Sequence, residues 1–169
     1  KKKMKSEKKK KFIYSSLIIL IIFFLDRFSK IYVLSLVKIN DSVDIFVSKY
    51  LNIYLIWNEG IAFGLLSFDQ SNLYNAITVV IVIISIAILV LIIKANDIRF
   101  YFYLFVFGGA LGNLFDRLYY SAVPDFIDLH INNYHWFIFN VADIFITIGV
   151  LCLILVELIF NKSLDDEKK

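Results

Sequence analysis

Two aspartates, Asp125 and Asp143, stand apart from the other charged residues, because neither has a basic residue near it in the sequence. Two carboxylates held close together in a partly dry site cannot both ionise, so they share one proton. One then acts as a base and the other as an acid near neutral pH. The base activates a water molecule that attacks a peptide carbonyl, and the acid supports the developing oxyanion. The pair therefore predicts aspartyl hydrolysis, which requires no cofactor, no metal and no covalent intermediate.

Other routes to hydrolysis find no support in the sequence. It contains no Gly-x-Ser-x-Gly segment, no His-Glu-x-x-His motif and no glycine-rich phosphate loop. The single cysteine, Cys152, excludes an intrachain disulfide and a cysteine-rich metal cluster. His130 and His135 lie five residues apart, and a metal site needs more ligands than these two. We therefore predict no metal site.

Further polar residues lie within apolar stretches, where ionisable groups are costly and mark candidate functional sites. Asp26 and Lys30 are four residues apart on one face of a helix, which is typical of a structural ion pair. The other members of this group are Asn113, Asp116, Arg117 and Asn140. Asp116 and Arg117 are also explained by a tie between neighbouring helices. All of these residues converge at one level of the expected membrane.

The apolar runs that position these residues are long. With 169 residues, of which 60% are hydrophobic, and a mean hydropathy of +0.75, the chain has more apolar surface than a soluble domain of this size can bury. A helix needs roughly 20 apolar residues to cross a bilayer. Four runs reach or approach that length: Phe12–Val37, Tyr74–Ile93, Phe100–Tyr120 and Trp136–Phe160. We predict an all-α membrane protein with four transmembrane helices, in which Gly108 and Gly112 allow close helix packing.

The basic residues predict the orientation of these helices, because cytoplasmic segments carry an excess of lysine and arginine. Thirteen of the 18 basic residues lie in segments 1–11, 94–99 and 161–169. We therefore expect two cytoplasmic tails, 1–11 and 161–169, around a single integral-membrane domain, 12–160. Segments 38–73 and 120–135 then face outward. The positive charge serves topology and contact with anionic lipid rather than binding of nucleic acid. We expect the amino-terminal run to be retained, because no small-residue cleavage site follows it.

The first outward segment has the character of a strand. Val43–Trp57 mixes β-branched and aromatic residues with partial alternation, which predicts a small sheet at the membrane surface. Asn58–Leu66 predicts a turn into a short interfacial helix. Several aromatic residues suit a membrane interface: Tyr54, Trp57, Tyr119, Tyr120 and Trp136.

Five short motifs occur in order along the chain: Leu25–Lys30, Asn58–Gly64, Gly108–Arg117, Val123–Phe126 and Phe139–Asp143. In this order and on this topology, they resemble the motifs of the bacterial lipoprotein signal peptidases, also called signal peptidase II. The resemblance extends from about Phe24 to Val150. Two departures are Pro124, where the family would have a residue such as valine, and the charged Glu59 at a variable position. A proline there removes a backbone donor and stiffens the approach to Asp125.

The resemblance implies an endopeptidase that removes the signal peptide from diacylglyceryl-modified prolipoproteins by cutting before the lipidated cysteine. It implies a multi-pass protein of the bacterial cytoplasmic (inner) membrane, with four transmembrane helices, cytoplasmic termini and an outward β-cradle beside the active site. It assigns Asp125 and Asp143 as the catalytic dyad. The supporting residues would be Asp26, Lys30, Asn58, Gly60, Asn113, Arg117 and Asn140. We expect a monomer whose partners are lipid-modified prolipoproteins and membrane lipid, with segment 43–66 clamping the substrate and Asn58 bonding its backbone.

The residues alone are also compatible with two other classes of function. A small carrier or assembly factor would use buried acids to bind ions or protons. A transport path, however, needs polar groups at successive depths, and here they gather at one interface. A rhomboid-like serine protease would need the serine motif and an intramembrane histidine, which this sequence lacks.

Overall fold

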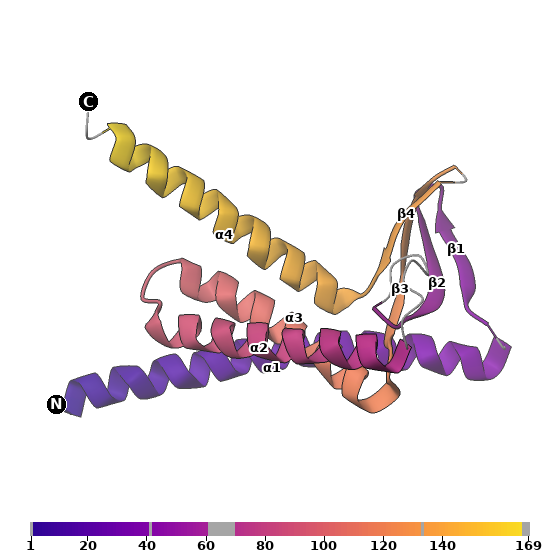
Figure 1. Ribbon diagram of the computed structural model, residues 1–169, viewed down its shortest axis with the longest axis horizontal. Coiled ribbons are helices and arrows are strands. Elements are labelled where there is room, and N and C mark those ends of the chain that lie inside the picture. The colour runs from indigo at the N-terminus through magenta and orange to yellow at the C-terminus, as the bar shows by residue number, and fades with distance from the viewer. Residues whose placement is uncertain (1, 41, 61–69, 133, 167–169) are drawn as a thin grey trace.

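A computed structural model describes the chain except for residues 1, 41, 61–69, 133 and 167–169 (Figure 1). The elements follow in the order α1 (Lys2–Asn40), β1 (Asp44–Ser48), β2 (Leu51–Asn58), α2 (Gln70–Lys94), α3 (Arg99–Tyr120), β3 (Val123–Ile131), β4 (Tyr134–Phe139) and α4 (Val141–Asp166). The prediction of a mostly helical protein with a small sheet is confirmed. The expected interfacial helix falls mainly on 61–66, outside the described residues.

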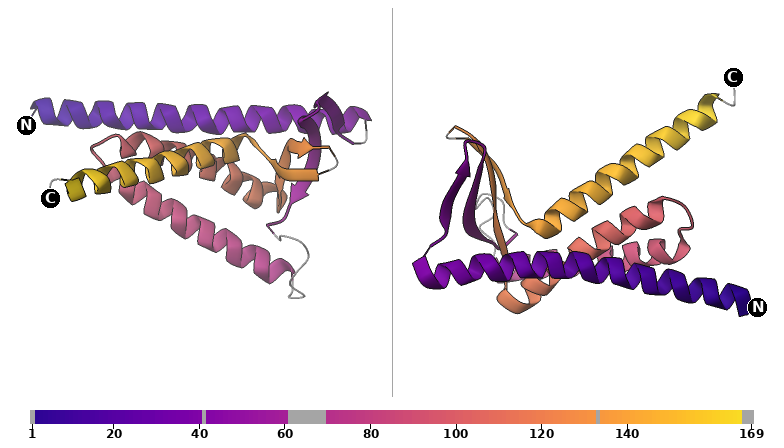
Figure 2. Two further views of the ribbon diagram at one scale, coloured as in Figure 1. Left: turned by 90° about the horizontal axis from the view of Figure 1, so that it is seen from above. Right: turned by 180° about the vertical axis from the view of Figure 1, so that it is seen from behind.

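Helix α3 packs against each of the other three helices and so forms the centre of the helical part. Both termini and the turn between α2 and α3 lie at one end of the molecule, and the sheet lies at the other (Figures 1 and 2). The two segments expected to face outward therefore meet at the same end. Helix α1 contributes to both parts, because it runs along the helices and continues past the sheet.

The helices have apolar exteriors and charged interiors, the reverse of a soluble protein. Among the described residues, two helices are long and apolar enough to cross a membrane, Tyr74–Lys94 with mean hydropathy 3.5 and Val141–Phe160 with mean hydropathy 2.6. The charged residues Asp26 and Lys30 of α1 and Asp116 of α3 are fully buried. Large apolar side chains are exposed on all four helices. The protein thus presents hydrocarbon outward and keeps its helical charges against one another.

The sheet combines the two outward segments. Its strand order is β1-β2-β3-β4 and every neighbouring pair is antiparallel, so β2 from the first segment pairs with β3 from the second. The predicted strand character of Val43–Trp57 is confirmed by the β1–β2 hairpin. Val33 of α1, Val43 and Phe126 of β3 form a small core between helix and sheet.

Two boundaries differ from the sequence prediction. The sequence predicts a loop around Asp125 and a fourth helix that begins at Trp136, whereas Asp125 lies in β3 and Trp136–Phe139 lie in β4. Helix α4 begins only at Val141, so Asn140 precedes it. The reason is that a continuous apolar run is compatible with either a strand or a helix. Pairing of β4 with β3 decides between them.

Pro124, the departure from the expected motif, is buried in β3 opposite Trp57. The register of β2 against β3 is irregular just beyond, between Ile53 and Ile56. Strands tolerate a residue without a backbone N–H beside such irregularities. The proline is therefore compatible with a strand that leads directly into Asp125.

Glycines of α3 permit the close approach of its neighbours, as the spacing of Gly108 and Gly112 predicted. A Cβ atom at Gly108 would lie 3.0 Å from the side chain of Ile22 in α1. At Gly112 it would lie 2.6 Å from Oδ2 of Asp26, a distance that real Cβ contacts do not adopt. The missing side chain at Gly112 therefore leaves room for a buried carboxylate.

We predict that Gly112→Ala lowers the thermal unfolding midpoint by several degrees, because the added methyl group must displace Asp26. Such overpacking costs about 1–3 kcal/mol. The measurement is thermal unfolding of the purified protein in detergent. Ala76→Val, which enlarges an exposed side chain on α2, serves as the control and should leave the midpoint nearly unchanged. Equal midpoints for Gly112→Ala and the wild type would contradict this packing argument.

Candidate active site

The site begins at the amino terminus of α4, where Asn140 and Asp143 cap the helix reciprocally. The backbone N–H of Asp143 donates to Oδ1 of Asn140 at 3.2 Å, and the backbone N–H of Asn140 donates to Oδ2 of Asp143 at 3.0 Å. This exchange satisfies two backbone donors at the helix end. The cap holds the Asp143 carboxylate at the start of the helix.

Asn140 extends the same network to Asp125. Its Nδ2 donates to Oδ1 of Asp125 at 2.6 Å, while Nδ2 of Asn58 donates to Oδ2 at 2.9 Å. Oδ1 of Asn58 accepts from the backbone N–H of Gly60 at 2.7 Å. Asp125 is therefore held by two amides, one at the end of β2 and one before α4. Both polar groups of Asn58 are engaged within the protein, which favours a positioning role over the expected bond to a substrate backbone.

Asp143 has a second support from α3. Nδ2 of Asn113 donates to Oδ1 of Asp143 at 2.7 Å, and Oδ1 of Asn113 accepts from Nζ of Lys30 at 3.0 Å. An ammonium group can only donate, so Lys30 fixes which end of the Asn113 amide faces Asp143. The orientation of this amide thus depends on a charge in α1.

Lys30 belongs to a buried cluster of four charges between α1 and α3. Its Nζ lies 2.8 Å from Oδ2 of Asp26 and 2.6 Å from Oδ2 of Asp116, and Arg27 forms an ion pair with Asp116. The predicted helical pair of Asp26 and Lys30 is therefore present. Oδ1 of Asp26 also accepts the backbone N–H of Ala142 at 2.9 Å, which ties α1 to the start of α4. Two carboxylates and two cations neutralise each other where isolated charges would be costly.

We did not identify Arg27 as a site residue from the sequence. Its position next to Asp26 inside an apolar run could have identified it, because a charge there needs a partner. That partner, Asp116, comes from α3 and lies 89 positions along the chain.

Both aspartates border one cavity of about 850 Å³. Its polar lining includes Asn58, Asp125 and Asp143, whereas most of its wall is apolar. The wall residues are Tyr50, Leu129, His130, Ile131, Trp136, Phe137, Ile138, Phe139, Ile144, Thr147 and Ile148. The sheet and α4 therefore line an open cavity that is bordered by two carboxylates and by a largely apolar wall.

The surroundings of Asp125 change its acidity. Burial raises the pKa of Asp125 from 3.8 to about 6, because the charged form loses solvation. The hydrogen bonds from Asn58 and Asn140 act in the opposite direction, and the nearby charge of Asp143 raises the pKa further. A carboxyl group with this pKa can hold or accept a proton close to neutral pH.

Arg117 and Gly60 lie close to each other at the end of β2. The Arg117 guanidinium stands over the ring of Tyr74 at 5.8 Å, and the Tyr74 hydroxyl donates to the Arg117 carbonyl at 2.7 Å. A Cβ atom at Gly60 would lie 3.1 Å from Nη1 of Arg117. Gly60 also has φ +80°, a conformation suited to glycine. These contacts place Arg117 beside the end of β2.

A second cluster was not expected. Asp128, a fully buried residue of β3 that we did not single out, lies 2.8 Å from Nδ1 of His135 and 3.6 Å from Nδ1 of His130. Asp128 therefore adds a third possible ligand to the two histidines. The period-two alternation of a strand could have paired Asp128 with His130, had β3 been recognised.

The family of the chain follows from its similarity to known proteins. A family model described as signal peptidase (SPase) II matches residues 18–160. The lipoprotein signal peptidase of Pelagibacter ubique (strain HTCC1062) is 55% identical over 146 residues, covering 86% of this chain and 88% of that protein. The lipoprotein signal peptidase of Anaplasma phagocytophilum (strain HZ) is 39% identical over 134 residues, covering 79% and 85%.

The fold agrees with these matches. A solved bacterial membrane enzyme is 33% identical in sequence and superposes with a TM-score of 0.69 over 86% of this chain and 92% of the other. A second, at 31% identity, gives a TM-score of 0.65 over 89% and 90%. Since sequence and fold agree over most of its length, the chain belongs to the signal peptidase II family.

Proposed function

We propose that this membrane peptidase is an aspartyl endopeptidase that removes the signal peptide from diacylglyceryl-modified prolipoproteins, cutting before the lipidated cysteine. The observation that carries the proposal is the placement of Asp125 and Asp143 on one cavity, each hydrogen-bonded to Asn140. The names of the relatives support the same substrate class. No cofactor is needed for this chemistry.

The two carboxylates act as one unit in the proposed reaction. The ionised member takes a proton from a water molecule, whose oxygen attacks the scissile carbonyl carbon. The protonated member donates its proton to the carbonyl oxygen, which gives a neutral tetrahedral intermediate. When the intermediate collapses, the carbon–nitrogen bond breaks, the leaving nitrogen receives the proton that was taken from water, and the other carboxylate takes a proton from a hydroxyl group of the intermediate as the carbonyl re-forms. The pair thereby returns to its starting state with one shared proton.

The remaining site residues position the dyad. Asn140, Asn58 and Asn113 orient the two carboxylates, because each donates an amide hydrogen to one of them. Asp26 and Lys30 hold α1 and α4 in the arrangement on which these amides depend. Gly60 and Arg117 support the chain where β2 ends. In this scheme only the two aspartates exchange protons with the substrate.

The proposed topology has four transmembrane helices in the bacterial cytoplasmic membrane, with both termini cytoplasmic and the active site on the outer side. The charged residues of α1 and α3 are compatible with spanning, because they contact one another rather than lipid. The sheet end, opposite to both termini, would then lie at the outer surface. Tails 1–11 and 161–169 would flank one peptidase domain, 12–160, acting as a monomer.

The apolar wall of the cavity suits a substrate that enters from lipid. The acyl chains can remain in the membrane while the peptide lies beside the aspartates. Each buried methylene contributes about 0.8 kcal/mol, so two acyl chains anchor a substrate strongly without side-chain specificity. We therefore expect recognition to depend first on the lipid and second on the peptide.

Asp125→Asn and Asp143→Asn should each lower the turnover of a lipidated precursor by at least about a thousandfold, because asparagine cannot share the proton. The substitution Asp143→Asn keeps a side-chain oxygen that can accept the backbone N–H of Asn140, so the cap of α4 can persist. The assay is single-turnover cleavage by purified protein, with thermal unfolding as the test of folding. Asp44→Asn, which removes an exposed carboxylate from β1, is the matched control and should retain activity. Near-normal turnover by either dyad variant would remove that aspartate from the mechanism.

The pH dependence of kcat/KM should be bell-shaped, because activity requires one proton on the pair. The raised pKa of Asp125 means that the last shared proton leaves as the pH rises through about 6, so kcat/KM should fall on that side. It should fall again at lower pH, where both groups are protonated. Recovery of full activity after return to the optimum pH separates titration from unfolding. A constant kcat/KM across the range from mildly acidic to neutral pH would contradict the shared-proton scheme.

A precursor without the diacylglyceryl group should be cleaved at least about a hundredfold less efficiently, which corresponds to roughly 2.7 kcal/mol. The comparison uses two precursors with identical peptides and one enzyme preparation, and kcat/KM is measured for each. Equal values would refute lipid-first recognition while leaving the aspartyl mechanism intact.

A further inference from the structure

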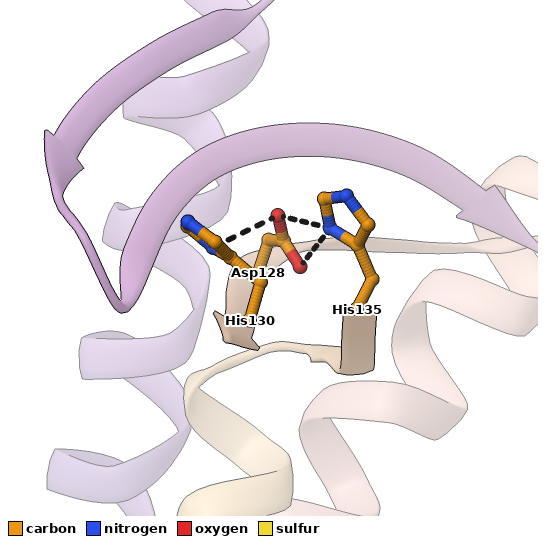
Figure 3. Close-up of side chains that lie close together, drawn as sticks. All are labelled: Asp128, His130 and His135. Atoms are coloured by element: carbon orange, nitrogen blue, oxygen red, sulfur yellow. Dashed lines mark hydrogen bonds and ion pairs between the residues drawn. The ribbon is translucent and has the colours of Figure 1, made fainter. Parts of the chain in front are cut away.

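The β3–β4 hairpin carries both histidines of the chain and a buried aspartate on one face. Asp128 and His130 are two residues apart on β3, so their side chains project to the same side. His135 of β4 is the register partner of His130. A register shift between Leu129 and His130 accompanies this pairing. Figure 3 shows the three side chains pointing toward one another.

The three side chains are within reach of a single ion. Nδ1 of His135 lies 2.9 and 2.8 Å from the two oxygens of Asp128, and Nδ1 of His130 lies 3.6 Å from Oδ2 (Figure 3). One ligand atom from each residue falls within 4.8 Å of the others. The imidazole rings are 5.5 Å apart between centroids. Two imidazoles and a carboxylate thus converge on one point.

The internal contacts of the cluster do not satisfy all of its members. Asp128 is fully buried and bonds to His135. His130 is only 8% exposed, yet its Nδ1 has no hydrogen-bond partner among the residues that the structure describes. A buried ring nitrogen without a partner is costly. This nitrogen is directed toward the Asp128 carboxylate, where a cation would satisfy both.

We propose that Asp128, His130 and His135 bind a divalent transition metal, with Zn²⁺ as the ion that suits them best. Two neutral imidazoles and one carboxylate are ligands that zinc commonly takes, with a fourth position left for water. The same donors exclude a preference for Mg²⁺ or Ca²⁺, which select oxygen ligands. The site is independent of the proposed peptidase chemistry.

Metal binding requires only a modest rearrangement. Bonds of about 2.0–2.1 Å place tetrahedral ligand atoms about 3.4 Å apart, closer than the widest spacing now present. The side chain of His135 is 54% exposed, so it can rotate toward the buried pair without disturbing the core. The ion would then link β3 to β4. Because His130 also lines the cavity that holds Asp125 and Asp143, the ion would brace the wall of that cavity.

The test uses the full-length protein in detergent, purified through a tag that contains no histidine. Zn²⁺ is titrated by calorimetry, and Cu²⁺ is used as an electron paramagnetic resonance probe of nitrogen ligands. We expect one equivalent of Zn²⁺, nitrogen couplings from two imidazoles, and a higher unfolding midpoint when Zn²⁺ is present. Since the chain has only two histidines, two imidazole couplings can come only from His130 and His135.

His135→Gln should weaken Zn²⁺ binding at least tenfold and abolish the rise in the unfolding midpoint. Its exposed position makes it the variant of choice, and Asp128→Asn is a second variant with the same expected loss. Asp44→Asn removes a carboxylate from the same sheet and should bind Zn²⁺ like the wild type. The proposal is overturned if the wild type binds no Zn²⁺, if His135→Gln binds it equally well, or if Asp143→Asn alone abolishes binding.

Discussion

Lys30 is an ammonium group with no access to solvent, and the arrangement of the helices follows from how its charge is satisfied. In a low-dielectric interior an unpaired charge is costly, and a pair is retained only when its remaining hydrogen bonds are also made. Lys30 donates hydrogen bonds to Asp26 and Asn113 and forms a further ion pair with Asp116. The same contacts draw α3 against α1. They also turn the Asn113 amide toward Asp143, so a structural charge sets the orientation of a group at the site.

Asn140 links the sheet to α4, as Lys30 links α1 to α3. One amide caps the helix through its oxygen and holds Asp125 through its nitrogen. The arrangement keeps a buried carboxyl group whose pKa is about 6. Because that pKa is raised, the contribution of Asp125 to stability is fully present below its ordinary pKa of 3.8 and is lost as the pH rises through about 6. Burial of this readily protonated carboxyl group thus lowers the free energy of unfolding once the group is ionised.

Much of the protein followed from local patterns in the sequence. Apolar runs located the helices, since lipid-facing surfaces require long stretches without charge. The spacing of Asp26 and Lys30 predicted their ion pair, and that of Gly108 and Gly112 predicted close packing on α3. The strand character of Val43–Trp57 predicted the first hairpin. The ordered motifs indicated the family. Each of these properties is set within a few residues, by helix or strand periodicity.

Only the tertiary structure decided which residues meet. Hydropathy could not place Trp136–Phe139 in a strand, because the hydrogen bonds that make it one come from β3. Nor could it show that Arg27 pairs with Asp116, or that Asp128 faces His135, since these contacts depend on packing and on strand register. It also could not show that one asparagine, Asn140, contacts both of the carboxylates that the motifs indicated. Sequence patterns therefore determined the helices and the first hairpin, whereas long-range pairing, which no local period encodes, determined β3, β4 and the contacts between elements.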